Sequence, residues 1–180
     1  MAALLHRFRT DESLMLRYGE GDVSAFTELY QRHKDRLYRF LLRSAQEPAL
    51  AEDIVQEAWT AVIRHAANYT PQASFKTWLY TIARRKLIDH HRRKQELPQE
   101  STTEAVDSGN CLDEQLQVQR LLQLITELPQ EQRQSFILKE EGFSLREIAA
   151  ITECGEETVK SRIRYARASL RAGMGVDDEF

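Results

Sequence analysis

The sequence predicts an all-α protein made of two small helical domains joined by a flexible acidic linker, with a helix-turn-helix in the second domain. Apolar residues recur every three or four positions along most of the chain, which is the period of an amphipathic helix. Glycine and proline are few, with 7 and 4 residues. Between positions 96 and 114 the composition becomes acidic and polar. We therefore expect domains over residues 1–95 and 115–180, with the linker over 96–114.

The composition is that of a soluble globular protein, with 42% hydrophobic and 29% charged residues. The formal net charge is only −3, so any DNA-binding surface must be local. Cys111 and Cys154 are too few for a disulfide framework and lack zinc-ligand spacing, which favours a cytoplasmic location. No apolar run approaches the roughly 20 residues of a membrane span, so we expect no membrane contact.

The first predicted helix begins after Asp22, a suitable N-cap, and ends before Pro48. Its apolar face runs from Phe26 to Leu41 and includes His33. A histidine on such a face is expected to be a core residue with a satisfied partner.

The second predicted helix starts at Pro48, a residue that suits the first helical position. Its apolar stripe extends from Ala51 to Val62, and the opposite face carries Glu52, Asp53, Gln56 and Glu57. This acidic edge, with three carboxylates and Gln56, suits docking on a basic helical partner. Acids are also favourable near a helix N-terminus, and composition alone favours a merely solvated face.

The third predicted helix follows a break at 68–72 and combines an apolar stripe with many cations. The stripe of Phe75, Trp78, Leu79 and Ile82 is expected to be core. Lys76 and Tyr80 lie off this stripe, and Arg84 falls one turn below Tyr80. Aromatic rings among cations suit single-stranded DNA, because stacking contributes about 1–3 kcal/mol per base. That is comparable with the cost of unstacking a step, so the surface would capture bases but not melt a duplex unaided.

The segment from 96 to 114 contains six acids and no lysine or arginine, namely Glu96, Glu100, Glu104, Asp107, Asp113 and Glu114. We interpret it as a mobile acidic linker. Helical periodicity resumes at Leu116, stops at Pro129 and continues through Phe136 to Leu138.

Residues 143–162 have the spacing of a helix-turn-helix. Ser144 and Glu147 form a predicted capping box, Gly155 can supply the turn, and Val159 and Ile163 anchor the second helix. That helix has no acid from 158 to 171 and offers Thr158, Ser161 and five cations, Lys160, Arg162, Arg164, Arg167 and Arg171. Short polar groups with arginines suit the major groove of DNA. The alternative is a basic amphipathic helix whose charges are only solvated.

No catalytic constellation is found. Asp89, His90 and His91 are neighbours in sequence, but successive helical residues point about 100° apart and cannot converge on one substrate. Nucleotide-binding glycine motifs and a nucleophile elbow are absent from the sequence. We expect no enzyme, no cofactor and no metal.

Taken in order, five segments resemble the extracytoplasmic-function (ECF) family of bacterial RNA polymerase sigma factors. They are residues 21–30, 51–59, 75–85, 128–133 and 158–162. Each segment alone is weakly specific, and their order and spacing carry the resemblance.

The resemblance implies partners and residue roles. The partners are core polymerase (the clamp of its β′ subunit, and its β subunit), promoter DNA and an anti-sigma factor, in a stress or envelope response. The clamp would be contacted by Asp53, Gln56 and Glu57. The −10 element would be contacted by Tyr69, Lys76, Trp78, Tyr80, Arg84, Arg85, Lys86, His90 and Arg93, with residues 69–74 forming a loop that receives a flipped base. The −35 element would be read by Ser144, Arg146, Thr158, Lys160, Ser161, Arg162, Arg164 and Arg167.

The chain departs from the family pattern at the turn, where Glu153 and Gly155 replace a common glycine and proline. Glu156 and Glu157 then open the second helix, where acids suit the helix dipole but repel phosphates. We expect the −35 contacts to begin at Thr158, with Glu157 able to accept from a cytosine amino group.

Two other functions explain part of the sequence. A conventional helix-turn-helix regulator accounts for the second domain but leaves the aromatic and cationic third helix unused. A protein-binding helical adaptor accounts for the charged helices without any DNA. A further hypothesis places the acidic linker in a basic polymerase channel that RNA later occupies.

Overall fold

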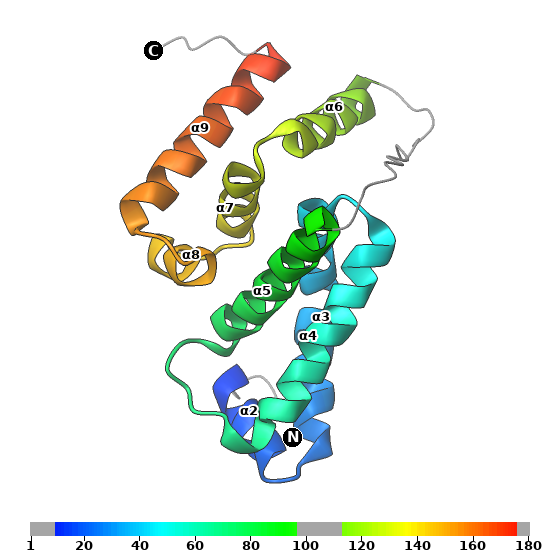
Figure 1. The fold of residues 1–180 in the computed structure, drawn as a ribbon, viewed down its shortest axis with the longest axis vertical. Coiled ribbons are helices and arrows are strands. Elements are labelled where there is room, and N and C mark those ends of the chain that lie inside the picture. The colour runs from blue at the N-terminus through cyan, green and yellow to red at the C-terminus, as the bar shows by residue number, and fades with distance from the viewer. Residues whose placement is uncertain (1–9, 97–112, 176–180) are drawn as a thin grey trace.

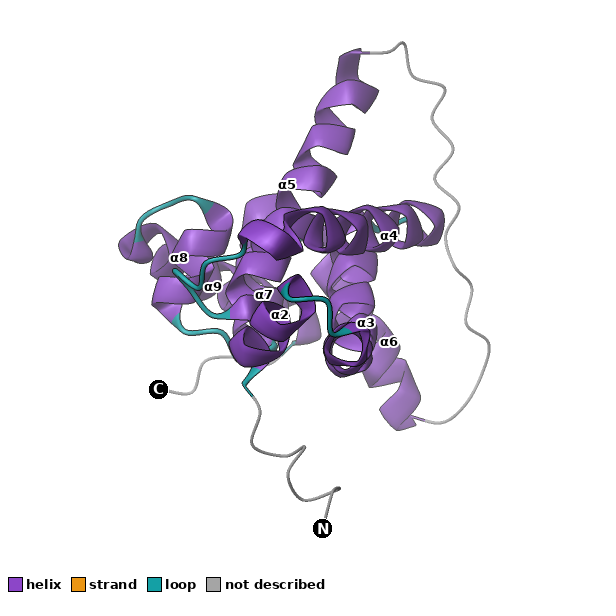
Figure 2. Ribbon diagram, turned by 90° about the horizontal axis from the view of Figure 1, so that it is seen from below, coloured by secondary structure: helices purple, strands orange, loops and turns teal. Residues whose placement is uncertain are grey.

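The computed structural model describes residues 10–96 and 113–175, and it confirms the all-α prediction. Over these residues Figure 2 shows only helices and the loops between them. The first group of helices comprises α2 (Asp11–Gly19), α3 (Val23–Ala45), α4 (Pro48–His65), the short 3-10 helix η2 (Ala66–Asn68) and α5 (Phe75–Glu96). The second group comprises α6 (Asp113–Glu127), α7 (Gln130–Glu140), α8 (Leu145–Thr152) and α9 (Glu156–Met174).

Local sequence signals set the start of several helices. The carboxylate of Asp22 accepts from the amides of Ser24 at 3.0 Å and Ala25 at 3.3 Å, which caps α3 as predicted. The same helix ends at Ala45, its C-cap Gln46 has a left-handed φ of 61°, and α4 then begins at Pro48. These two boundaries agree with the prediction.

Helix α2 was not predicted. The side chain of Thr10 caps it by accepting from the amide of Ser13 at 3.2 Å, and acids occupy its first turn. Leu14 and Met15 are completely buried. The cap and the two acids were visible in the sequence, but a helix of nine residues shows too little periodicity to be recognised.

His33 is a core histidine, as expected. Its side chain is buried, and Nε2 lies 2.7 Å from the carboxylate of Asp11 on α2. Burial raises the pKa of Asp11, but hydrogen bonds from His33 and Arg32 outweigh burial, so the pKa lies below its ordinary value.

The helix-turn-helix consists of α8 and α9. The predicted capping box is present, since Ser144 Oγ accepts from the amide of Glu147 at 3.2 Å and Glu147 accepts from the amide of Ser144 at 2.9 Å. Gly155 lies in the turn between α8 and α9, as expected, but it is not the left-handed residue of that turn. Gly155 has an ordinary φ of −73°, whereas Glu153 adopts the left-handed conformation with a φ of 55°.

The predicted linker is shorter than expected at both ends. Glu96 is the last residue of α5, and Asp113 and Glu114 open α6. The remaining linker acids and Cys111 lie outside the described residues.

The two groups of helices lie against each other, with α8 beside α5 (Figure 1). Helix α7 also packs against α3. The guanidinium of Arg133 on α7 donates to the carbonyl of Ser44 on α3 at 3.2 Å. Gln46 donates to the carbonyl of Thr126 on α6 at 2.6 Å. This packing determines which predicted site residues reach the surface.

Candidate nucleic-acid and polymerase interface

Four residues of α5 contact the second group of helices, and we call them the α5 face: Lys76, Tyr80, Arg84 and Arg85. Tyr80 is completely buried, with its ring centroid 5.0 Å from that of Phe40 and 4.9 Å from that of Phe143. The amino group of Lys76 donates to the carbonyl of Glu141 at 2.7 Å and lies 3.9 Å from the Phe143 ring. The expectation that Tyr80 escapes the core is wrong in this structure, because Phe143 from the second group covers it.

Arg84 is also buried, with an exposed fraction of 4%. Its guanidinium donates to Gln134 Oε1 at 3.0 Å and to the carbonyl of Ile151 at 3.4 Å, and lies 3.6 Å from Glu131. Burial lowers the pKa of Arg84 and Glu131 opposes this, but the group remains charged. Arg85 pairs with Glu153 at 2.7 Å. The partners of both arginines thus come from the second group of helices.

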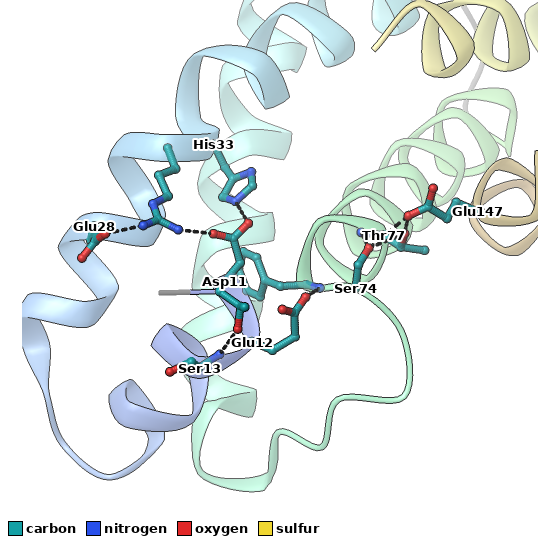
Figure 3. A network of polar contacts seen from close by, with 11 residues as sticks. Asp11, Glu12, Ser13, Glu28, His33, Ser74, Thr77 and Glu147 are labelled. Atoms are coloured by element: carbon teal, nitrogen blue, oxygen red, sulfur yellow. Dashed lines mark hydrogen bonds and ion pairs between the residues drawn. The ribbon is translucent and has the colours of Figure 1, made fainter. Parts of the chain in front are cut away.

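Glu147 extends this contact to the beginning of α5 (Figure 3). Its Oε1 accepts from Thr77 Oγ1 at 3.1 Å and from Ser74 Oγ at 3.3 Å, while Oε2 serves the capping box of α8. Burial raises the pKa of Glu147, but the hydrogen bonds from Ser144, Thr77 and Ser74 dominate and lower it. One carboxylate therefore caps α8 and holds the first turn of α5.

The aromatic residues around the predicted base-receiving loop form a cluster. Tyr69 is buried, and its ring centroid lies 5.0 Å from that of Trp78 and 6.4 Å from that of Phe75. Burial, helped by Glu12 and Asp11, raises the pKa of Tyr69 to about 12. Phe75 is core as expected, whereas Trp78 is half-buried.

The later part of α5 is more open. Lys86 pairs with Glu57 at 2.8 Å, His90 is half-buried and Arg93 is exposed. His91 has a lowered pKa, mainly because of burial and then because of the neighbouring His90 and Lys94.

The predicted clamp-binding residues Asp53, Gln56 and Glu57 are exposed on α4. They line a groove between α4 and α5 whose other polar walls are Thr60, Arg64, Lys86 and His90. The acids thus stand beside cations, of which Lys86 is already paired with Glu57.

The α9 face consists of the predicted −35 residues Thr158, Lys160, Ser161, Arg162, Arg164 and Arg167. Thr158, Lys160, Arg164 and Arg167 are exposed, whereas Ser161 and Arg162 are half-buried. Arg162 pairs with Glu131 at 2.7 Å, Lys160 pairs with Glu157 at 2.6 Å, and Arg167 lies 3.6 Å from Glu140. On α8 the Ser144 hydroxyl serves the capping box, and Arg146 is exposed.

Two residues of this region were not predicted. Lys139 on α7 joins Lys160, Arg164, Arg167 and Arg171 around a basic groove. Glu131 contacts both Arg84 on the α5 face and Arg162 on the α9 face. Local spacing could not predict these contacts of Glu131, because its partners lie 47 positions before it and 31 after it.

Two family models match the chain, one over each group of helices. The family model "Sigma-70 region 2" matches residues 29–96, and "Sigma-70, region 4" matches residues 118–170. The chain is 33% identical to the "ECF RNA polymerase sigma factor RpoE" of Cereibacter sphaeroides, over 92% of this chain and 96% of the relative.

Two solved structures resemble most of the chain. Sigma factor RpoE of Bartonella quintana, in complex with the anti-sigma factor NepR, matches with a TM-score of 0.70 and 26% identity over 87% of this chain and 100% of that one. CnrH, in complex with the cytosolic domain of CnrY, matches with a TM-score of 0.70 and 25% identity over 93% and 99%. Within the part of the chain that the structure describes, no helix is long and apolar enough to cross a membrane.

Proposed function

We propose residue roles from one premise: the chain belongs to the ECF family of RNA polymerase sigma factors. The observation that carries the premise is the 33% identity to an ECF sigma factor over 96% of that relative, supported by regions 2 and 4 in their order. The chain thus directs core polymerase to promoters for transcription initiation. Sigma factors are non-catalytic initiation factors, and we extend this to the present chain and place it in the cytoplasm.

Each charged surface receives one role. Asp53, Gln56 and Glu57 dock on the polymerase clamp, and their exposure along the groove supports this. The α5 face, with Trp78 and the more open Lys86, His90 and Arg93, contacts the −10 strand that separates from the duplex. The α9 face, with Ser144 and Arg146, reads the −35 duplex, supported by the four exposed side chains on α9. A conventional helix-turn-helix regulator or a protein-binding adaptor would leave residues 29–96, which match sigma-70 region 2, without a role.

These roles require the two groups of helices to separate. Tyr80 and Arg84 cannot contact a DNA strand while Phe143, Gln134 and the Ile151 carbonyl occupy them. We infer that this closed arrangement belongs to the polymerase-free protein and that core binding opens it. Phosphates can then replace Glu131 and Glu153 as partners of the arginines.

Control by an anti-sigma factor fits this arrangement. Of the two solved structures described above, one is a sigma factor in complex with an anti-sigma factor, and the other is CnrH in complex with the cytosolic domain of CnrY. A protein that holds the helices closed would keep the α5 face from DNA.

Transcription in a reconstituted system tests the proposed function. Core polymerase with the purified chain should start at defined sites on genomic DNA, and sequencing the transcripts should reveal paired −35 and −10 elements. Core polymerase alone is the control. Absence of chain-dependent start sites from any genomic fragment would contradict the proposal.

A further inference from the structure

Helix α2 lies outside the residues matched by sigma-70 region 2, which begin at position 29, and none of the predicted site residues lies on it. Its two ends nevertheless contact the two ends of the segment 66–75, which contains the predicted base-receiving loop. We propose that α2 positions this loop for capture of the −10 base, and that Glu12 is the positioning residue. This inference rests on the proposed function.

The contact at the end of the segment is a helix cap supplied from a distance. Glu12 Oε1 accepts from the backbone amide of Phe75, the first residue of α5, at 2.8 Å (Figure 3). Such an amide has no partner within its own helix, and a carboxylate also suits the positive end of the helix dipole. Ser74 provides the local cap, since its Oγ accepts from the amide of Thr77 at 3.2 Å. The start of α5 is therefore fixed both locally and from α2.

The contact at the start of the segment is a close backbone approach. A Cβ atom placed on Gly19 would lie 2.6 Å from the carbonyl oxygen of Ala66 in η2. That distance is well inside van der Waals contact, so α2 and η2 can approach this closely only because residue 19 has no side chain. Gly19 and Glu12 thus bracket the loop from opposite ends of α2.

Helix α2 is itself held firmly in place. Asp11 lies 2.7 Å from both Arg32 Nη1 and His33 Nε2 on α3, and Leu14 and Met15 are completely buried. The His33 ring also packs 5.5 Å from that of Phe75, centroid to centroid. A shift of Glu12 would therefore require movement of the core, so the position of α3 is transmitted through α2 to the loop.

Capture of a single strand by the holoenzyme tests the inference. The probe is an oligonucleotide that carries the non-template −10 sequence of a promoter found by transcript sequencing, with 2-aminopurine at the base that flips. Glu12→Ala should weaken capture about tenfold, the scale of a charge-assisted hydrogen bond. Glu12→Gln should bind within about threefold of the native chain, because its amide oxygen still accepts from Phe75.

The controls separate positioning from general stability. Glu20→Ala removes an exposed acid at the other end of α2 and should leave capture unchanged. Core affinity should be nearly the same in all of these variants, and the melting temperature should fall by no more than the few degrees that loss of one helix cap costs. Gly19→Ala, which displaces η2, should also lower the 2-aminopurine signal, and Glu12→Ala decides the question if the Gly19 variant fails to fold.

Three outcomes contradict the inference, and a fourth contradicts the proposed function on which it rests. Unchanged capture by Glu12→Ala would overturn it, as would equal losses in the Ala and Gln variants. A capture defect that tracks a loss of core affinity and of melting temperature would show a merely structural role. Failure of the native chain to form a holoenzyme that captures any strand would instead refute the proposed function.

Discussion

The α5 face and the α9 face carry similar cations but differ in accessibility. Tyr80 and Arg84 on α5 have exposed fractions of 0% and 4%, whereas Thr158, Lys160, Arg164 and Arg167 on α9 are exposed. The proposed duplex reader is therefore largely open before any rearrangement, while Tyr80 and Arg84 of the proposed strand reader are covered by the second group of helices. Charge pattern determines what a face can bind, and packing determines when it can bind.

The largest expected effect compares two tyrosines. Tyr80→Ala should lower the free energy of unfolding by about 3–5 kcal/mol, because a large buried ring is lost between Phe40 and Phe143. Tyr165→Ala on α9 should cost under about 1 kcal/mol, because that ring is 54% exposed. Urea unfolding measures both changes.

Tyr80→Phe is the matched control, because the buried Tyr80 hydroxyl has no hydrogen-bond partner. Its stability should equal or exceed that of the native chain. If Tyr165→Ala lowered the free energy of unfolding as much as Tyr80→Ala does, the contrast between the two faces would be refuted.

The groove between α4 and α5, which Asp53, Gln56 and Glu57 line, provides a third surface for the comparison. Asp53→Ala combined with Gln56→Ala should weaken binding to core polymerase about tenfold, on the scale of one or two lost polar contacts. Circular dichroism should be unchanged, because both side chains are exposed. Asp35→Ala, which removes an exposed acid on α3, is the charge-matched control. Unchanged affinity of the double variant would refute the docking role.

Glu131 contacts an arginine on each of the two faces, so its replacement should make both arginines more available to DNA. Glu131→Gln should raise DNA binding by the free chain about threefold, because Arg84 and Arg162 both lose an ionic partner. The effect is small because Glu131 is half-exposed and water screens such pairs. Fluorescence anisotropy of a labelled promoter fragment measures it.

Glu127→Gln, which changes an exposed acid on α6, is the control for net charge. An equal gain in both variants would mean that charge alone, and not the contact between the faces, limits DNA binding.

The smallest expected effect is a pH dependence of the contact between α5 and α8. The pKa of Glu147 is lowered in the folded chain, so its contribution is fully present above its unfolded pKa of about 4.5 and is lost as pH falls through the folded pKa. Because solvent screens this group, the loss should be under about 1 kcal/mol. Unfolding free energies at pH 6 and pH 3.5 measure it.

Asp11 and Asp22 also have lowered pKa values, so the native chain alone does not isolate Glu147. Glu147→Gln should show a shallower decline in stability over the same pH range. Identical declines in the two proteins would contradict this assignment.

Local features were predictable because local chemistry produces them. The Asp22 cap, the start of α4 at Pro48, the capping box of α8 and the burial of His33 all follow from residue type and helical spacing. The exposure of the acids on α4 follows from the same period, because they lie opposite a continuous apolar stripe.

Periodicity within a helix cannot state which other helix covers it. Tyr80 and Arg84 lie off the apolar stripe of α5, and only tertiary structure brings Phe143, Gln134 and Ile151 against them. The Glu12 cap on Phe75 joins residues 63 positions apart, and the contacts of Glu131 span two helix groups. The sequence by itself determined the helices, their caps and the chemistry of each face. Packing between distant segments decided which face is open and what holds the loop, because contacts at such separations leave no mark on local spacing.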